Sequence, residues 1–404
     1  MSTSLLYHEF GIRGYKYETT IRLEGVAMFV LSQERHLLRC PHCGTPDVQR
    51  RGEVPRVFHV LPIGSRQVKV LLPIARVYCA RCDATRQVKV GFADEGQHYS
   101  RSFERYVLDL SRNMTIAAVA KHLQVGWDLV KKIQQRHLEK HYAKPKLKGL
   151  KEIAIDEISI GRGHKYLTVV LDLRSGAVVF VGKGKGADAL LPFWKRLKAS
   201  RARVKAVAID MSPAYTQAVR ENLKEAVLVY DHFHIIKLFN KKLTELRREL
   251  YREAKAGPDK DVLMGILWLL LKNPENLDPT KQEPERLAAA LELNSSLFVA
   301  YYMKEQLRRL WEQPDKRSAR KLLNGWIALA DVSGIRILKS FAKTLAAHRE
   351  GILAWYDYRI STGPLEGTNN KIKTMKRQAY GFRDIEFLKL KIMAIHEANY
   401  VLVG

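Results

Sequence analysis

Four cysteines stand in two pairs that have the spacing of metal ligands. They are Cys40 and Cys43 in CPHCG, and Cys79 and Cys82 in CARCD, and the chain has no other cysteine. Two such pairs can surround one Zn²⁺ with four thiolates, because each short turn directs both of its sulfurs inward. The segment between the pairs is rich in β-branched residues and is broken by Pro-Ile-Gly, which predicts a β-hairpin. We therefore expect a zinc-ribbon-like domain over residues 1–100, with four reduced structural cysteines or a redox pair as the alternative.

Two aspartates lie in strand patterns that would bring them together. EIAIDEISIG, HKYLTVVLDL and GAVVFVGKG predict three antiparallel strands, and VKAVAID and AVLVYDHFH predict two more, each preceded by a helical segment. This is the strand and helix order of the ribonuclease-H-like α/β fold, in which the first and fourth strands are neighbours. Asp156, in the first strand, and Asp210, at the end of the fourth, would then face each other. A divalent cation such as Mg²⁺ or Mn²⁺ would relieve the repulsion between their carboxylates.

Glu366 is the candidate for a third carboxylate, which would allow two metal ions to bind together with a phosphate oxygen. It follows Gly363 and Pro364, which suit the N-cap and the first turn of a helix. The alternative is that Glu366 merely complements the helix dipole. When the residues are placed at helical spacing, one side of this helix is apolar. The other side is polar in its first turns and basic in its later turns. The apolar residues are Leu365, Ile372, Met375, Ala379 and Phe382, and the polar ones are Glu366, Asn370, Lys373 and Arg377.

Residues 101–142 have a helical pattern that fits a helix-turn-helix. Ala120, Leu123, Val125, Val130 and Ile133 stand where such a unit needs packing residues, and QVGW supplies the turn. The second helix would present Lys131, Lys132, Gln134 and Gln135 to a DNA groove. A plain three-helix packing unit with a solvated basic face is the alternative.

The overall charge indicates a polyanionic partner. The chain has 69 Lys and Arg against 42 Asp and Glu, a formal net charge of +27, and a sequence pI of about 9.9. These basic residues are spread along the whole chain, which favours a long contact with nucleic acid over a membrane anchor. The N-terminus has no signal-peptide pattern, and the longest apolar run, Val262–Leu271, is too short for a bilayer and predicts a buried helix. We expect a cytoplasmic, nucleoid-associated protein.

The remaining segments complete the expected multidomain α+β organisation. A linker over 143–150 leads to the first part of the catalytic domain, residues 151–240, and residues 356–404 form its second part. The mostly helical residues 241–355 between them are interpreted as an all-helical insertion. Its four tryptophans are expected to pack between helices rather than to stack on bases. They are Trp268, Trp311, Trp326 and Trp355.

Several of these motifs together resemble one family. STGPLEGTNNKIKTMKRQAYGFRD, IDE followed by GHKYLTVVLD, AIDMSPAY and DHFHIIK are similar to segments of the ISL-three-like transposases of prokaryotic insertion sequences. The resemblance covers essentially the whole chain. It implies that Asp156, Asp210 and Glu366 form an acidic catalytic triad. It also implies that the four cysteines bind zinc, and that residues near 112–138 bind terminal repeats. Asp231 and His234 match a motif at the end of the fifth strand, which implies a supporting role near the metals or the DNA, although an Asp-His hydrogen bond that holds a turn is the alternative.

The expected function is therefore that of a two-metal DNA transposase. It would bind the terminal inverted repeats of its element, cleave DNA with two Mg²⁺ or Mn²⁺ ions, and join the freed 3′ end to target DNA, as a homodimer or larger assembly on DNA. One structural Zn²⁺ is expected in addition. Two other functions remain open at this point: a zinc-dependent DNA-binding regulator that does not cut, and a nuclease or resolvase that cuts without joining.

Overall fold

The computed structural model describes residues 5–161, 163–254 and 258–396 of the chain. They fall in two compact units. The first comprises residues up to 141 together with 377–382, and the second comprises 142–376 and the residues from 383 onward. Within the described ranges, no helix is both long and apolar enough to cross a bilayer.

The first unit begins with a five-stranded sheet. After the short helix α1 (Leu5–His8) come β1 (Tyr15–Leu23), β2 (Val26–Gln33), the 3-10 helix η1 (Arg35–Leu37), β3 (Gln49–His59), β4 (Gln67–Cys79) and β5 (Ala84–Gln87). The order is β1-β2-β4-β3, with β5 paired to β4. β3 and β4 form the predicted antiparallel hairpin. Buried and less buried residues alternate along most of β4, as expected for a strand with one face on a core.

Three helices follow the sheet: α2 (Arg101–Leu110), α3 (Ile116–Leu123) and α4 (Trp127–Tyr142). The Thr115 side chain caps α3 by accepting from the Ala118 amide at 3.1 Å. Gln124 ends α3 in the left-handed conformation, with φ 54°, and so fills the turn position where glycine is common. All five predicted packing residues lie in the three-helix core, although Val125 is only partly buried. The predicted helix-turn-helix arrangement is therefore confirmed.

The second unit contains a mixed sheet of β6 (Glu152–Gly161), β7 (Lys165–Asp172), β8 (Val178–Lys183), β9 (Ala206–Ile209) and β10 (Val227–Tyr230). The order is β10-β9-β6-β7-β8. β6, β7 and β8 are antiparallel neighbours, whereas β9 runs parallel to both β6 and β10. This places the first and fourth strands of the domain side by side, as the sequence predicts.

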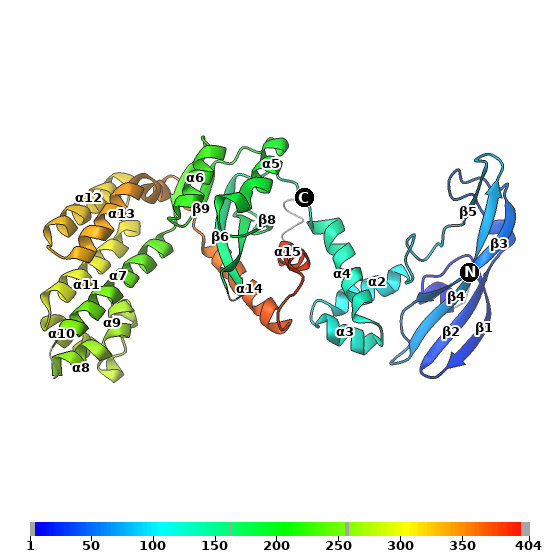
Figure 1. Cartoon of the computed structure of the whole chain (residues 1–404), viewed down its shortest axis with the longest axis horizontal. Coiled ribbons are helices and arrows are strands. Elements are labelled where there is room, and N and C mark those ends of the chain that lie inside the picture. The colour runs from blue at the N-terminus through cyan, green and yellow to red at the C-terminus, as the bar shows by residue number, and fades with distance from the viewer. Residues whose placement is uncertain (1–4, 162, 255–257, 397–404) are drawn as a thin grey trace. The chain divides into compact units, whose positions relative to one another are not determined.

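The two faces of β6 are covered by different elements. Ile153 and Ile155 belong to the core that includes Phe193 of α5 (Leu191–Ser200) and Tyr215 of α6 (Pro213–Asn222). Because side chains alternate along a strand, Ala154 and Asp156 point to the opposite face. That face carries α14 (Gly363–Gln378), which passes alongside β6 in Figure 1.

Between β10 and α14, the described residues contain helices but no strand. In chain order the elements are α7 (His232–Glu253), α8 (Pro258–Gly265), α9 (Leu267–Leu271), η3 (Pro274–Asn276), η4 (Pro279–Lys281), α10 (Glu283–Glu292), α11 (Ser295–Arg308), η5 (Arg309–Glu312), α12 (Lys316–Val332), α13 (Arg336–Leu353) and η6 (Ala354–Tyr356). The remaining elements of the unit are η2 (Ala187–Leu190), before α5, and α15 (Ile385–Met393), after α14.

Two expectations for this helical segment were wrong. The apolar run Val262–Leu271 is divided between α8 and α9 rather than forming one helix. Trp268, on α9, has 72% of its surface exposed, whereas Trp326 is buried and donates from Nε1 to the Met303 carbonyl at 2.8 Å. A short helix of five residues has room for only one buried face, occupied here by Leu269 and Leu270.

Gly351 allows α13 to pack closely against the end of β10. A Cβ at this position would lie 2.5 Å from Cε2 of Tyr230 and 3.3 Å from the Leu228 carbonyl oxygen. Gly351→Ala is therefore expected to lower the free energy of unfolding of the second unit by about 1–3 kcal/mol, through overpacking. Thermal unfolding followed by circular dichroism checks this.

Gly325 provides the matched control for Gly351. It lies in α12, is exposed, and has open space where a Cβ would be. Gly325→Ala should raise stability by about 0.5–1 kcal/mol, because alanine favours a helix interior. If Gly351→Ala were stabilising to the same extent, the close contact with Tyr230 would have no energetic importance.

Candidate active site and metal centre

The four cysteines converge at the base of the β3-β4 hairpin. The Sγ atoms of Cys40 and Cys82 are 3.9 Å apart, and those of Cys43 and Cys79 are 3.6 Å apart. A tetrahedral Zn²⁺ with Zn–S bonds of about 2.3 Å requires sulfur atoms roughly 3.8 Å apart. Cys40 and Cys79 are also buried, and backbone amides of Cys43 and His42 lower the pKa of the Cys40 thiol to about 6. The thiol set therefore fits a structural Zn²⁺.

Strand register places Asp156 and Asp210 on the same side of neighbouring strands. In the parallel pair β6-β9, the last matched residues are Ala154 and Ala208. Asp156 and Asp210 each lie two residues further on, so both side chains continue on the same face as that pair. The Asp210 Oδ1 atom accepts from the Ser212 amide at 2.9 Å, which holds this carboxylate at the start of α6.

The Asp156 carboxylate accepts two hydrogen bonds, and its surroundings disfavour its charged form. Its Oδ1 accepts from the Glu157 amide at 2.8 Å, and its Oδ2 accepts from the Asn369 side chain at 2.9 Å. Burial raises the pKa of Asp156, and the negative charge of Asp210 adds to this, although the Glu157 amide and nearby His234 act in the opposite direction. Such a carboxylate beside a second carboxylate is suited to binding a cation.

Glu366 is exposed and lies in the first turn of α14. This helix begins at Gly363, so the preceding Thr362, rather than Gly363, takes the N-cap position, and its carbonyl accepts from the Leu365 and Glu366 amides at 2.9 Å. Glu366 is one helical turn before Asn369, whose side chain contacts Asp156.

The ligand atoms of the three predicted carboxylates do not all lie within 4.8 Å of one another. Among the described residues, the four cysteines are the one group of three or more potential ligands whose donor atoms all lie within 4.8 Å of one another. The structure therefore brings Asp156 near Asp210 and brings the helix of Glu366 against Asp156, but it does not bring all three carboxylates to a common ligand distance.

Asn369 is a site residue that sequence reasoning missed. It is 6% exposed, and its Oδ1 has no hydrogen-bond partner, while its Nδ2 is bound to Asp156. A buried amide oxygen without a partner is costly, and it is also a good ligand for a hard cation. One feature of the sequence could have indicated it: Asn369 stands three residues after Glu366 in EGTNN, which places both on one side of the helix.

Glu157 and Tyr215 form a second polar group on the other face of β6. Burial raises the pKa of Glu157, and Asp210 and Asp156 raise it further, whereas a hydrogen bond with Tyr215 lowers it. The Tyr215 hydroxyl is 3.0 Å from Oγ1 of Thr168. The motif IDE contains this glutamate, but only the alternation of the strand shows that it faces α6 rather than α14.

Asp231 joins the end of β10 to the start of α14. It follows β10 and caps α7, where its Oδ1 accepts from the Phe233 amide at 3.2 Å. The Thr362 hydroxyl donates to its Oδ2, and His234 Nδ1 is 3.5 Å from the same oxygen. Asp231 and His234 thus lie at the β10-α7 junction, with His234 in the first turn of the helix rather than in the strand.

Asp231 and the two catalytic candidates also influence the protonation of His234. The nearby Asp231 carboxylate raises the pKa of His234 against the effect of burial, and Asp156 and Asp210 raise it further.

The predicted DNA-contacting residues of α4 have different environments. Lys132 is exposed, and Lys131 and Gln135 are half-buried. Gln134 is 4% exposed and donates from Nε2 to the Ser111 hydroxyl at 2.8 Å. Gln134 therefore packs within the three-helix unit rather than facing a groove, because it lies on the same side of α4 as Val130.

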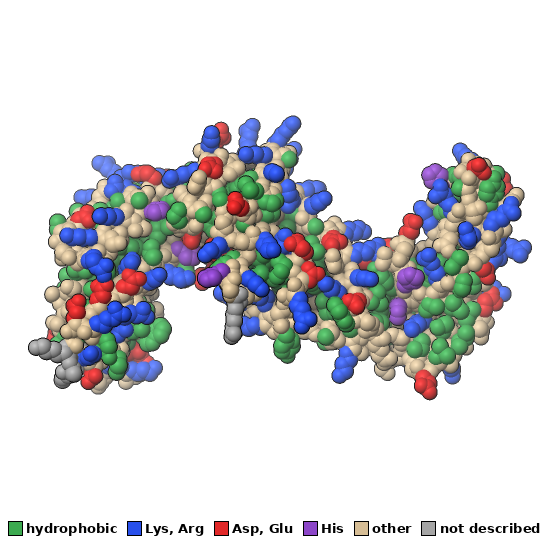
Figure 2. All heavy atoms as spheres, viewed as in Figure 1, with side chains coloured by type: hydrophobic (Ala, Val, Ile, Leu, Met, Phe, Trp, Pro, Cys, Tyr) green, Lys and Arg blue, Asp and Glu red, His purple; other side chains and the backbone are tan. Residues whose placement is uncertain are grey.

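The polar face of α14 is accessible along its length. Asn370, Lys373 and Arg377 are all exposed. Figure 2 shows Lys and Arg side chains on both units rather than in one segment, as the sequence predicts.

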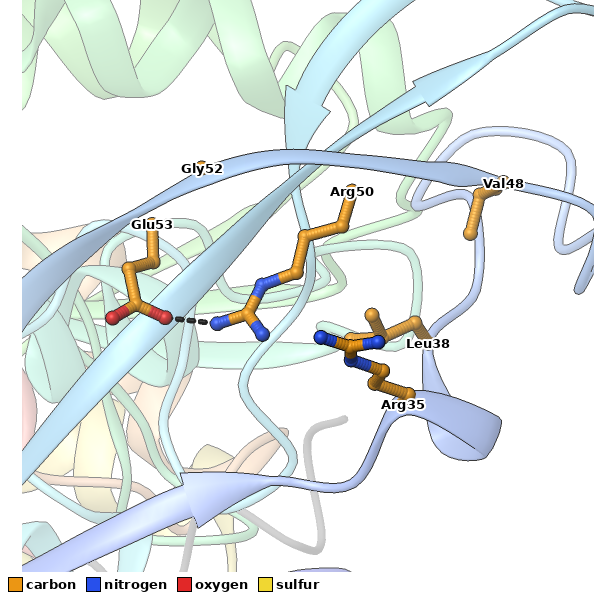
Figure 3. Close-up of a pocket in the computed structure, with 6 residues that line it drawn as sticks. All are labelled: Arg35, Leu38, Val48, Arg50, Gly52 and Glu53. Atoms are coloured by element: carbon orange, nitrogen blue, oxygen red, sulfur yellow. Dashed lines mark hydrogen bonds and ion pairs between the residues drawn. The ribbon is translucent and has the colours of Figure 1, made fainter.

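An open pocket in the first unit contains none of the predicted site residues. It is lined by Arg35, Leu38, Val48, Arg50, Gly52 and Glu53 (Figure 3). Arg50 and Glu53, which both come from β3, form an ion pair in its lining.

Comparisons with known proteins agree with the order of these domains. The zinc-finger model of the transposases IS204, IS1001, IS1096 and IS1165 matches residues 37–82. The helix-turn-helix model of transposase family ISL3 matches residues 88–138, and the ISL3 transposase model matches residues 153–392.

Individual proteins are similar over most of the chain. The transposase for insertion sequence element IS1001 of Bordetella parapertussis is 31% identical over 366 residues, which cover 90% of each chain. The transposase for IS1557 of Mycobacterium tuberculosis is 29% identical and covers 87% of this chain and 84% of its own. The Drosophila P element transposase strand transfer complex has a TM-score of 0.38 at 11% identity, covering 76% of this chain and 95% of that chain, which is too weak to indicate a shared fold. The match of the catalytic-domain model to more than half of the chain, together with the IS1001 relative, shows that this protein belongs to the ISL3 family of transposases.

Proposed function

We propose that the protein is a DNA transposase that binds the terminal inverted repeats of an insertion sequence, cleaves DNA at the element ends and joins the freed ends to target DNA. The observation that carries this proposal is the pair Asp156 and Asp210, held in register on neighbouring parallel strands beside α14. The strand order β8-β7-β6-β9-β10, with three antiparallel strands followed by two parallel ones, supports a ribonuclease-H-like catalytic domain.

Asp156, Asp210 and Glu366 are proposed as the catalytic carboxylates and the ligands of two Mg²⁺ or Mn²⁺ ions. The hard oxygen donors and the unpartnered Asn369 oxygen fit such cations. Bound there, the ions would activate a water for attack on the phosphodiester and stabilise the leaving 3′ oxygen. The chain's own groups position these carboxylates. Asn369 and the Glu157 amide orient Asp156, and the Ser212 amide orients Asp210. Asp231, at the end of β10, accepts from the hydroxyl of the residue before α14.

DNA contacts are proposed for both units. Lys131, Lys132 and Gln135 of α4 would contact the terminal repeat, while Asn370, Lys373 and Arg377 would bind phosphates near the catalytic site. Because two element ends must be joined in one reaction, a dimer or larger assembly on DNA is proposed. Cys40, Cys43, Cys79 and Cys82 are proposed to hold one Zn²⁺ that maintains the first domain.

We propose the following domain limits: 1–100 for the zinc-ribbon-like domain, 101–142 for the helix-turn-helix, 143–150 for the linker, 151–240 and 356–404 for the two catalytic parts, and 241–355 for the helical insertion. The common core that joins α7, α11 and α13 to the sheet supports an insertion that packs on the catalytic domain.

The direct test uses a labelled duplex that ends in the element's own terminal repeat, with a second duplex as target. With Mg²⁺ or Mn²⁺, cleavage and a joined product carrying the labelled 3′ end are expected. Binding without cleavage over a range of duplex designs would indicate a regulator, and cleavage without joining would indicate a nuclease or resolvase.

Asn369→Ala is expected to reduce cleavage by about 10- to 100-fold, as is typical when a residue that orients a metal ligand is lost. The Mg²⁺ concentration needed for half-maximal rate should rise, because Asp156 loses its donor. Cleavage rates measured as a function of Mg²⁺ check this. Asn370→Ala is the control on the same turn, since Asn370 is exposed and should affect DNA affinity more than metal dependence. An unchanged Mg²⁺ dependence for Asn369→Ala would contradict the positioning role.

A further inference from the structure

The turn that joins α14 to α15 holds a tyrosine in an unfavourable position. Tyr380 is 98% exposed, which leaves its ring almost entirely in water. Its backbone is left-handed, with φ 53°, and Gly381 follows with φ 99°. Figure 1 shows this turn as the connection between α14 and α15.

Neither the exposed ring of Tyr380 nor its left-handed backbone conformation stabilises the fold. A bulky residue in the left-handed region costs about 1–2 kcal/mol, whereas glycine or asparagine adopts it readily. The ring recovers little of this cost, because it is exposed. Strained, exposed residues of this kind are concentrated at functional sites.

The surroundings of Tyr380 are cationic. Lys373, Lys376, Arg377 and Arg383 lie within eight positions of it, and no acidic residue occurs between Glu366 and Asp384. Lys373, Arg377 and Arg383 are exposed, and none of them forms an ion pair with any described residue of the chain. An exposed aromatic ring among unpaired cations is the combination by which proteins bind nucleic acid, with the cations on phosphates and the ring on a base.

We propose that Tyr380 stacks on a base of the element-end DNA. This inference rests on the proposed function, because it requires DNA to lie along α14 from Glu366. α14 rises about 1.5 Å per residue, so its last residue, Gln378, is about 18 Å from Glu366, and Tyr380 follows in the next turn. A strand with about 3.4 Å between nucleotides covers this distance in about five steps. The stacked base therefore lies about five to six nucleotides from the phosphate that is cut.

The experiment uses the full chain and 40-base-pair duplexes that end in the element's terminal repeat, already cut at the element end. Each duplex carries one 2-aminopurine, at a position between two and ten nucleotides from the cut. Wild-type protein should change the fluorescence most at positions five and six, with affinity measured by anisotropy in parallel.

Tyr380→Asn removes the ring while keeping a residue that tolerates the left-handed backbone. It should lower DNA affinity by about 10-fold and abolish the fluorescence change, because stacking on one base has an effect of this order. Its melting temperature should equal or exceed that of the wild type, which a structural role for Tyr380 would not produce. Tyr380→Trp should restore both DNA signals. Trp268→Ala removes another exposed ring, on α9, and should leave them unchanged.

Each failure has a distinct meaning. Wild-type affinity and fluorescence in Tyr380→Asn would overturn the inference. So would a changed oligomeric state of this variant without DNA in light scattering, because the ring would then dock on protein. Cleavage of the uncut duplex, measured with the same preparations, tests the proposed function separately: a wild type that stacks on the base but never cuts supports the inference and contradicts the transposase activity. A wild type that binds no element-end duplex would overturn both.

Discussion

Asp156→Asn, Asp210→Asn and Glu366→Gln should each reduce cleavage of element-end DNA by at least about 1,000-fold, equivalent to roughly 4 kcal/mol of transition-state stabilisation. Each substitution removes a negative charge from the proposed metal site while keeping the side-chain shape. DNA affinity, which depends mainly on Lys and Arg contacts with phosphates, should change by less than about threefold. Cleavage assays and anisotropy on the same duplex separate the two effects.

Asp188→Asn is the matched control for these carboxylates. Asp188 is an exposed acidic residue of η2 in the same unit, and its substitution should leave cleavage unchanged. If Glu366→Gln alone retained full activity, Glu366 would only complement the helix dipole, and Asn369 or another residue would have to complete the metal site. If all three variants cut normally, the catalytic assignment would be wrong.

The stability of Asp156→Asn distinguishes lost catalysis from lost folding. Burial and Asp210 raise the pKa of Asp156 in the folded protein, so between the ordinary carboxyl pKa and this raised pKa the folded state retains a proton that the unfolded state has lost. The contribution of Asp156 to stability therefore falls as the pH rises through the raised pKa. Without added Mg²⁺, Asp156→Asn should melt above the wild type at neutral pH, and the difference should shrink as the pH falls toward about 4. A lower melting temperature at neutral pH would contradict this account of the site.

Cys43→Ser should abolish stoichiometric zinc binding and unfold the region around residues 37–82. Zinc binding to four thiolates contributes about 10–16 kcal/mol in small zinc domains, more than a small β-domain core supplies by itself. We expect loss of one equivalent of zinc in metal analysis and rapid proteolysis within this segment. The helices of the second unit should remain folded, because they belong to a separate hydrophobic core. Removal of zinc from the wild type with a chelator should have the same result.

His42→Ala is the control within the zinc site. His42 lies between the first two cysteines and is exposed, and only its backbone amide interacts with Cys40. This variant should retain one zinc and resist proteolysis as the wild type does. Full zinc content and unchanged protease resistance in Cys43→Ser would show that the cysteines are reduced structural residues rather than metal ligands.

Local patterns were sufficient for much of the fold. Strict cysteine pairing predicts the convergence of four thiols, because a hairpin must return to its starting end. Strand and helix order predicts that the strand of Asp156 lies beside the strand that leads to Asp210, and in the structure β6 is indeed paired with β9, which ends one residue before Asp210. The helix-turn-helix packing residues follow from helical periodicity, since their spacing decides which side of each helix is buried.

Other features depended on contacts between distant segments. Gln134 has the polarity of a groove-facing residue, yet its amide is buried against Ser111. Trp268 has a large aromatic side chain of the kind usually found in a core, yet the break between α8 and α9 leaves it exposed to solvent. A residue type specifies what a side chain can do, whereas burial depends on which other elements cover it.

By itself, the sequence of this protein determined which residues could bind metal or DNA and which secondary structures carry them, because residue chemistry and hydrophobic period are local properties. The tertiary structure alone decided that Asn369 reaches Asp156 across 213 positions, that Thr362 contacts Asp231, and that Glu366 is presented one turn from that contact. The physical reason is that the approach of α14 to β6 is set by the packing of the whole second unit, and no local pattern within either segment encodes it.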